Sequence, residues 1–121
     1  MTKLLLVEDD PFLVKIYKLK LEREGYNIVY LEDGTKVVAK AVEYRPDLIL
    51  LDIVIPKKDG FQVLSELKIN SKTAKIPVLI LSALQMPADI AKGKALGADD
   101  YLLKTNVSFA QVISTIRKLT A

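Results

Sequence analysis

Carboxylate, hydroxyl and amine side chains stand where short apolar runs of the sequence end. They are Glu8, Asp9, Asp10, Asp52, Ser82 and Lys104. Crowded carboxylates repel one another, and a hard divalent cation with oxygen ligands relieves that repulsion. A nearby lysine supplies a positive charge, and a serine a hydroxyl, for the oxygens of a phosphoryl group. This set indicates phosphoryl transfer onto a carboxylate, assisted mainly by positioning and charge neutralisation.

Most of these residues also have an ordinary structural interpretation. Asp10 precedes Pro11 and suits a helix N-cap, Ser82 could cap the next segment, and Lys104 could be a solvated lysine. Asp52 is harder to explain in this way, because an acid that ends an all-apolar strand is costly without a partner. Since the residue types coincide at strand ends, we favour the functional interpretation, with Asp52 as the nucleophile.

The composition excludes several classes of chemistry. The chain has no cysteine and no histidine, which removes thiol catalysis, disulfides, imidazole triads and most zinc sites. Lys and Arg outnumber Asp and Glu by 18 to 15, but the cations are scattered, which is typical of a solvated surface. The apolar run 4–7 is too short for a signal peptide, and no other stretch approaches membrane-spanning length. We expect a cytoplasmic protein with no direct nucleic-acid or membrane partner.

Short apolar runs alternate with longer amphipathic segments from end to end. Strands are expected at 4–7, 27–31, 48–51, 78–81 and 100–103, and helices at 11–24, 35–44, 60–69, 87–96 and 108–119. Five strand–helix repeats predict an α/β fold, a doubly wound parallel sheet with helices on both faces. Its working crevice lies outside the carboxyl ends of the strands, where the polar residues stand.

Four stretches of the chain resemble the receiver domain of two-component response regulators, of the chemotaxis-regulator kind. They are LLVEDD (5–10), LLDIVIP (50–56) with Asp59 and Gly60, PVLILSA (77–83) and GADDYLLK (97–104). The resemblance covers essentially the whole chain. It implies a flavodoxin-like doubly wound five-stranded parallel sheet, strand order 2-1-3-4-5, with five helices. It also implies a phosphorelay switch that catalyses only its own phosphorylation and dephosphorylation, not a turnover enzyme.

The resemblance also implies a phosphoacceptor and a metal site. Asp52 would take the phosphoryl group from a phosphohistidine on a sensor histidine kinase or phosphotransfer protein. Asp9, Asp52 and the backbone carbonyl of Val54 would ligate Mg²⁺, or Mn²⁺, and Glu8 would act through water. The product would be an aspartyl phosphate.

A switching set of residues follows from the same resemblance. Lys104 would pair with the phosphoryl group, Ser82 would be drawn toward it, and Tyr101 would turn inward into the vacated space. Ala83 is small and would leave the approach open to donors and phosphatases. The face formed by the fourth helix, fifth strand and fifth helix would then signal to a downstream protein or an output domain. A phosphorylation-linked dimer would be an alternative output.

Two features of the sequence make this prediction more specific. Thr105 stands where the family usually has proline, often in a cis bond. Because a cis bond before another residue costs about 3–4 kcal/mol, we expect a trans Lys104–Thr105 bond and a reshaped loop, which puts the kinase-docking surface in doubt. The resemblance implies that Val54 and Leu84 flank the phosphoryl position, and both are apolar here, so neither can orient an attacking water. We therefore expect slow self-dephosphorylation.

Three alternatives stay open at this point. A degenerate receiver module of the same fold would ignore phosphate, and Thr105 is compatible with it. A metal-dependent phosphohydrolase would need a second acid to protonate the leaving group and a cap over the substrate. Asp59 is too far round its loop to be that acid, and the chain has no spare residues to form a cap. A flavin-binding protein would need a Ser/Thr/Gly-rich loop after the first strand, where acids stand instead.

With Met1 and a complete final helix, we expect a free-standing domain 1–121 without an output domain.

Overall fold

Five strands and five helices alternate along the computed structural model, which describes residues 1–121. The strands are β1 (Lys3–Val7), β2 (Asn27–Leu31), β3 (Leu48–Leu51), β4 (Val78–Ser82) and β5 (Asp100–Leu103). The helices are α1 (Pro11–Arg23), α2 (Val37–Tyr44), α3 (Gly60–Ile69), α4 (Pro87–Ala95) and α5 (Phe109–Thr120). Every predicted element is present, with its boundaries shifted by two residues at most.

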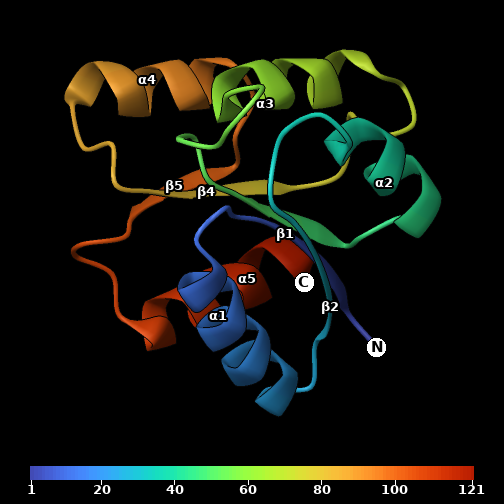
Figure 1. The fold of residues 1–121 in the computed structure, drawn as a ribbon, viewed down its shortest axis with the longest axis vertical. Helices are drawn as coiled ribbons and strands as arrows, with labels where there is room; N and C mark the ends of the chain where they lie inside the picture. Colours follow the sequence, from blue (N-terminus) through green and yellow to red (C-terminus); the bar gives the residue numbers. More distant parts are fainter.

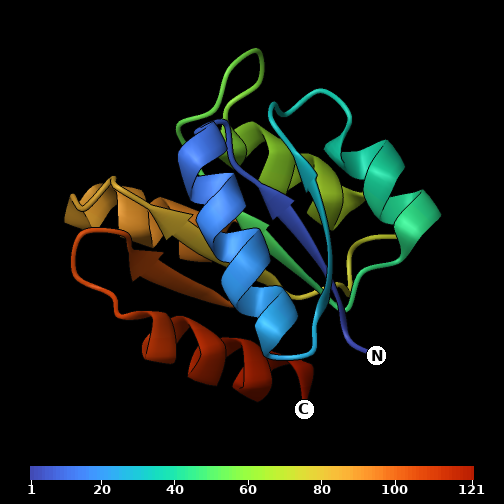
Figure 2. The same cartoon turned by 60° about the horizontal axis from the view of Figure 1, so that its bottom comes forward.

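The strands form one parallel sheet between two layers of helices. Its order is β2-β1-β3-β4-β5, which confirms the predicted topology. Helices α1 and α5 cover one face, and α2, α3 and α4 cover the other (Figures 1 and 2). Every residue of β3 and β4 is buried, as expected for the centre of such a sheet. None of the helices is long and apolar enough to cross a lipid bilayer.

The sheet has a hydrophobic core on each face because successive strand residues point to opposite sides. Residues of β1, β3 and β4 packed on the side of α2 and α3 are Leu5, Val7, Ile49, Leu51, Val78 and Ile80. Residues of the same three strands packed on the side of α1 and α5 are Leu4, Leu6, Leu48, Leu50, Leu79 and Leu81. The ends of the central strands are therefore anchored from both sides, which fixes the residues that follow them.

The start of α2 differs from the prediction. A helix was expected from Thr35, but α2 begins at Val37. The backbone N–H and the hydroxyl of Thr35 both donate to Asp33 Oδ1, at 2.8 Å and 2.5 Å. This Asp side chain holds the backbone in a turn, which competes with the helix.

The peptide bond between Lys104 and Thr105, in the loop after β5, has the predicted trans geometry. The chain contains no cis peptide bond, so the Lys104–Thr105 bond is trans. The backbone N–H groups of Asn106 and Val107 both donate to the Leu103 carbonyl, each at 3.0 Å, and so close a turn before α5.

Candidate functional site

The ends of four strands bring the predicted polar residues to one edge of the sheet. Val7 pairs with Leu51 in the register of β1 and β3, so Glu8 and Asp52 follow two adjacent strands. The Asp52 N–H donates to the Val7 carbonyl at 3.0 Å, which extends that pairing by one residue. Backbone hydrogen bonds between neighbouring strands therefore set the spacing of the acids.

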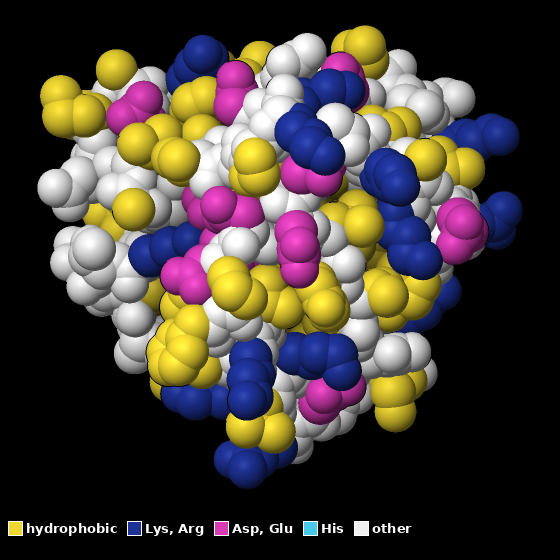
Figure 3. Space-filling view, viewed as in Figure 1, with side chains coloured by type: hydrophobic (Ala, Val, Ile, Leu, Met, Phe, Trp, Pro, Cys, Tyr) yellow, Lys and Arg dark blue, Asp and Glu magenta, His cyan; other side chains and the backbone are white.

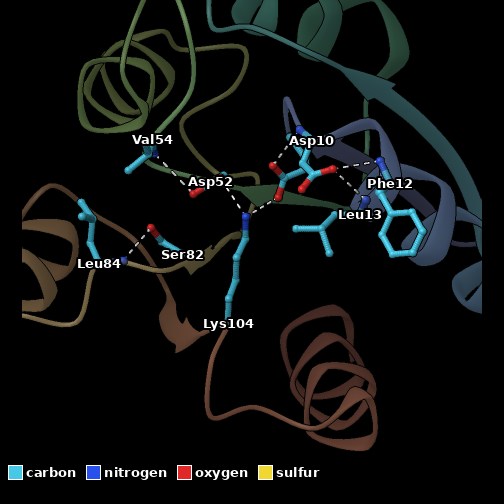
Figure 4. A network of polar contacts seen from close by, with 9 residues as sticks. Asp10, Phe12, Leu13, Asp52, Val54, Ser82, Leu84 and Lys104 are labelled. Carbon is cyan, nitrogen blue, oxygen red and sulfur yellow. Dashed lines mark hydrogen bonds and ion pairs between the residues drawn. The ribbon is translucent and has the colours of Figure 1, made fainter.

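The amine arrives from β5 in the same way. Ser82 pairs with Leu103, and the Lys104 N–H donates to the Ser82 carbonyl at 3.0 Å. Figure 4 shows the Lys104 side chain reaching across the strand ends toward Asp52. In Figure 3, acidic side chains gather left of the centre of the face viewed.

Lys104 joins two buried carboxylates. Its Nζ donates to Asp52 Oδ2 at 2.8 Å and also to Glu8 Oε1. Glu8 is 3% exposed and Asp52 6% exposed, whereas the Lys104 side chain is 16% exposed. Charges that are buried to this degree need a partner, and here one ammonium serves both acids.

Burial and pairing act in opposite directions on the ionisation of this group. Burial raises the pKa of Glu8 above its usual 4.5, although the hydrogen bond from Lys104 opposes the rise. Burial lowers the pKa of Lys104, but its hydrogen bonds to Asp52 and Glu8 outweigh that effect and hold it above 10.5. The lysine is therefore a fixed positive charge at neutral pH.

Three carboxylates are close enough to share a cation. One oxygen from each of Glu8, Asp9 and Asp52 lies within 4.8 Å of the others. Asp9 is exposed, which leaves that side open to water and to a substrate. Because Mg²⁺ takes one or two carboxylates, retains waters and completes its shell with phosphate oxygens, this donor set suits it.

Asp10 lies beside these acids but has a structural role. Its Oδ1 accepts from the Phe12 N–H at 2.9 Å and from the Leu13 N–H at 3.4 Å (Figure 4). Asp10 is thus the N-cap of α1, in agreement with its simplest interpretation. The Asp10 N–H also donates to Glu8 Oε2 at 3.2 Å, so the helix start helps to fix the Glu8 carboxylate.

The loop after Asp52 packs against its backbone. The Val54 N–H donates to Asp52 Oδ1 at 3.3 Å, and the Val54 side chain is 57% exposed. A Cβ atom on Gly60 would lie only 2.4 Å from the Asp52 carbonyl oxygen. Only glycine allows α3 to begin this close to the strand end. Sequence reasoning gave Gly60 no role in the site, although the Asp59–Gly60 pair was a signal of it.

The predicted switch residues are linked through the backbone of one residue, Leu84. Ser82 is fully buried, and its Oγ accepts from the Leu84 N–H at 3.2 Å. The Tyr101 hydroxyl donates to the Leu84 carbonyl at 2.8 Å, with the residue 8% exposed. Tyr101 therefore already lies inward in this structure, and burial raises the pKa of its hydroxyl. Ala83 between them is exposed.

One contact was not foreseen from the sequence. Lys104 was expected to meet a phosphoryl group and Glu8 a water, but the two side chains pair directly. They are 96 residues apart in the chain, so no local pattern could have connected them. Asp9, Asp52, Ser82 and Lys104 all lie at the same edge of the sheet, as expected for residues that follow parallel strands.

Relatives of known identity have the same domain. The chain is 44% identical over 104 residues to the DNA-binding dual master transcriptional regulator RpaA of Synechocystis sp., which covers 86% of the chain and 43% of RpaA. It is 37% identical to the protein PilH of Pseudomonas aeruginosa, over 100% of the chain and 99% of PilH. The chain spans less than half the length of RpaA and of the Bacillus subtilis and Mycobacterium tuberculosis regulators PhoP and TcrX.

Solved structures and a family model agree with these relatives. The BeF₃-activated N-terminal receiver domain of Klebsiella pneumoniae RstA superposes with a TM-score of 0.92 at 27% identity, over 98% of both chains. The receiver domain of the sensor histidine kinase PA1611 from Pseudomonas aeruginosa, with magnesium coordinated in its active-site cleft, gives 0.90 at 27% identity over 98% and 97%. Residues 4–117 match the model of the response regulator receiver domain. This chain belongs to the response regulator receiver domain family of two-component signal transduction.

Proposed function

We propose that this chain is a phosphorylation-dependent switch in which Asp52 accepts a phosphoryl group. The observation that carries the proposal is the setting of the Asp52 carboxylate. It is 6% exposed, lies 2.8 Å from the Lys104 ammonium, and shares a 4.8 Å cluster with Glu8 and Asp9. An oxygen nucleophile is thus held beside a fixed cation and a cation-binding donor set, at an edge that is open through Asp9.

We assign the metal ligands to this donor set. Asp9, Asp52 and the backbone carbonyl of Val54 would hold Mg²⁺, or Mn²⁺, and Glu8 would act through water. When bound, the ion neutralises the repulsion between the carboxylates and the incoming phosphoryl oxygens. The exposed position of Asp9 and the magnesium in the related PA1611 receiver domain support the assignment.

The chain's own residues account for the transfer. An Asp52 oxygen attacks the phosphorus of a phosphohistidine on a sensor histidine kinase or phosphotransfer protein. As the new oxygen–phosphorus bond forms, the donor's nitrogen–phosphorus bond breaks, and the released imidazole takes a proton from solvent. The Lys104 ammonium, 2.8 Å from the carboxylate, then donates to a phosphoryl oxygen and neutralises part of its negative charge. The main contribution is positioning, because these groups are already held by strand ends.

The switch itself would run through Ser82 and Tyr101. A phosphoryl oxygen draws the Ser82 hydroxyl, which now accepts from the Leu84 N–H. Because the Leu84 carbonyl accepts from the Tyr101 hydroxyl at 2.8 Å, movement of Ser82 acts on Tyr101 through the backbone of Leu84. The result would be read on the α4-β5-α5 face by a downstream protein or an output domain, or through a phosphorylation-linked dimer.

The lifetime of the phosphorylated state follows from the side chains beside Asp52. Val54 and Leu84 are apolar and flank the predicted phosphoryl position, and neither can polarise water for attack on the phosphorus. Ala83 is exposed and small, so a partner's catalytic group can still approach. Slow spontaneous loss with access for a phosphatase is the expected behaviour.

The chain is a signalling module of its family rather than a turnover enzyme. We propose that residues 1–121 form one receiver domain that contacts proteins and not nucleic acid. Several of its cations are paired with acids, namely Lys18 with Glu22, Lys40 with Glu43 and Lys58 with Glu66. DNA binding in a relative such as RpaA is consistent with this, because the chain covers 43% of that protein.

Intact mass spectrometry tests the proposal. The protein is incubated with Mg²⁺ and a small phosphodonor, and Asp52→Asn serves as the control. An added mass of one phosphoryl group in the wild type, absent from Asp52→Asn, is the expected result. Rapid consumption of donor without an adduct would favour a phosphohydrolase, and an unchanged protein and donor would favour a phosphate-independent module.

A further inference from the structure

A glycine in the middle of α4 is the starting point. Gly93 is the one buried residue of this nine-residue helix. Glycine inside a helix lowers helix stability relative to alanine, because the unfolded backbone has more freedom to lose. Its presence at a buried helical position therefore calls for a packing reason.

The space beside Gly93 supplies that reason. A Cβ atom there would lie 2.8 Å from Ile80 Cδ1, and 3.1 Å and 3.3 Å from Cδ2 and Cε2 of Tyr101. Ile80 is completely buried and Tyr101 is 8% exposed, so neither has free room on its other side. Figure 1 shows α4 in the helix layer on this side of the sheet, near β4 and β5. The backbone of α4 is thus in direct contact with the edge of the tyrosine ring.

The inward ring of Tyr101 is consequently held at two places. Its hydroxyl donates to the Leu84 carbonyl, and its ring edge lies against the bare backbone of Gly93. The first contact ties the ring to the segment that follows Ser82. The second makes the position of the ring depend on the position of α4. A methyl group at position 93 would occupy part of the volume that the ring now fills.

We propose that Gly93 is the positioning residue for the switch tyrosine. Because it lacks a Cβ atom, α4 can lie close to the sheet while Tyr101 is turned inward. The inference rests on the proposed function, in which the inward Tyr101 ring marks the phosphorylated state. It adds a steric link, since a partner that displaces α4 would act on the ring directly.

Gly93→Ala is the variant that tests this link. The added methyl meets Ile80 Cδ1 in either arrangement but meets the Tyr101 ring only when that ring is inward, so the inward-to-outward ratio should fall by about tenfold. A phosphoryl analogue that favours the inward ring should lose affinity by up to the same factor. Ala91→Gly, at an exposed position of α4, is the control for altered helix propensity.

The readout is ¹⁹F NMR of protein labelled with 3-fluorotyrosine. The chain has five tyrosines, and Tyr101→Phe assigns the resonance of interest. In Gly93→Ala the Tyr101 resonance should shift toward its solvent-exposed position without any analogue, and beryllofluoride with Mg²⁺ should bind more weakly, by at most about tenfold. Ala91→Gly should change neither. A Tyr101 resonance that does not respond to Gly93→Ala overturns the inference.

Two further comparisons keep the test decisive. If Gly93→Ala folds poorly, urea unfolding is measured in the backgrounds Tyr101→Ala and Ile80→Val, the second of which removes Cδ1. If Tyr101→Ala reduces the loss of unfolding free energy caused by Gly93→Ala, the inference is supported. If only Ile80→Val reduces that loss, the inference is overturned. A wild-type protein that binds no beryllofluoride would instead overturn the proposed function, and the analogue-free resonance still decides the role of Gly93.

Discussion

Replacing Lys104 with methionine removes the charge that pairs two buried acids while keeping a side chain of similar length. In the wild type, Nζ contacts Glu8 and lies 2.8 Å from Asp52 Oδ2. After Lys104→Met, both carboxylates stay buried, at 3% and 6% exposure in the present structure, without a cation. Leaving a buried charge unpaired is much more costly than losing an exposed ion pair.

The expected magnitude follows from this burial. Breaking a buried pair costs about 3–5 kcal/mol, and the partial exposure of the lysine puts the estimate at the lower end, about 3 kcal/mol. For a chain of 121 residues, that corresponds to a fall of about 10 °C in Tm. Mg²⁺ should restore more stability to the variant than to the wild type, because it replaces the lost cation.

Urea unfolding at neutral pH without divalent ions measures the effect. Lys68→Met is a matched control, because Lys68 is also partly buried but donates mainly to the neutral carbonyls of Ala74 and Ile76. It should cost less, about 1.5 kcal/mol, because the carbonyls left without their donor are neutral. Adding Asp52→Asn to Lys104→Met should recover part of the loss. Equal costs for the two lysines, with no recovery from Asp52→Asn, would refute the reasoning.

Three other outcomes are expected. Asp10→Ala should lower the unfolding free energy by about 1 kcal/mol through loss of the α1 cap, while Asp9→Ala without Mg²⁺ should change it little. Without Mg²⁺, the stability that Glu8 contributes is fully present below pH 4.5 and is lost as pH rises through its raised folded-state pKa. Glu8→Gln should therefore flatten this part of the plot of unfolding free energy against pH. An identical slope in wild type and variant would contradict the prediction. Val54→Asn should speed loss of the Asp52 phosphoryl group by about tenfold, measured by intact mass over time, and an unchanged rate would contradict it.

Most of the fold could be predicted because its signals are local. The run 48–51 is entirely apolar and forms a strand that is buried on both faces, as such a run indicates. The start of α2 was wrong by two residues, because the Asp33 side chain captures the donors of Thr35. Such side-chain competition with the backbone depends on rotamers that a sequence pattern does not show.

The site was predictable as a set of residues but not as a network. The rule that parallel strands end at one edge was sufficient to collect Asp9, Asp52, Ser82 and Lys104 there. The pairing of Lys104 with Glu8 and the inward position of Tyr101 depend on side-chain packing between distant segments. Gly93 was treated only as part of a helix, because its importance lies in the ring beside it.

Chemical trapping of the phosphorylated residue tests the central claim most directly. The protein is treated with phosphodonor with and without Mg²⁺, reduced with borohydride, digested, and mapped by mass spectrometry. The account predicts that the carboxyl of Asp52 alone is reduced to an alcohol, and only where Mg²⁺ and donor were both present. Reduction at a different acid, or reduction at Asp52 that is independent of Mg²⁺, would contradict it.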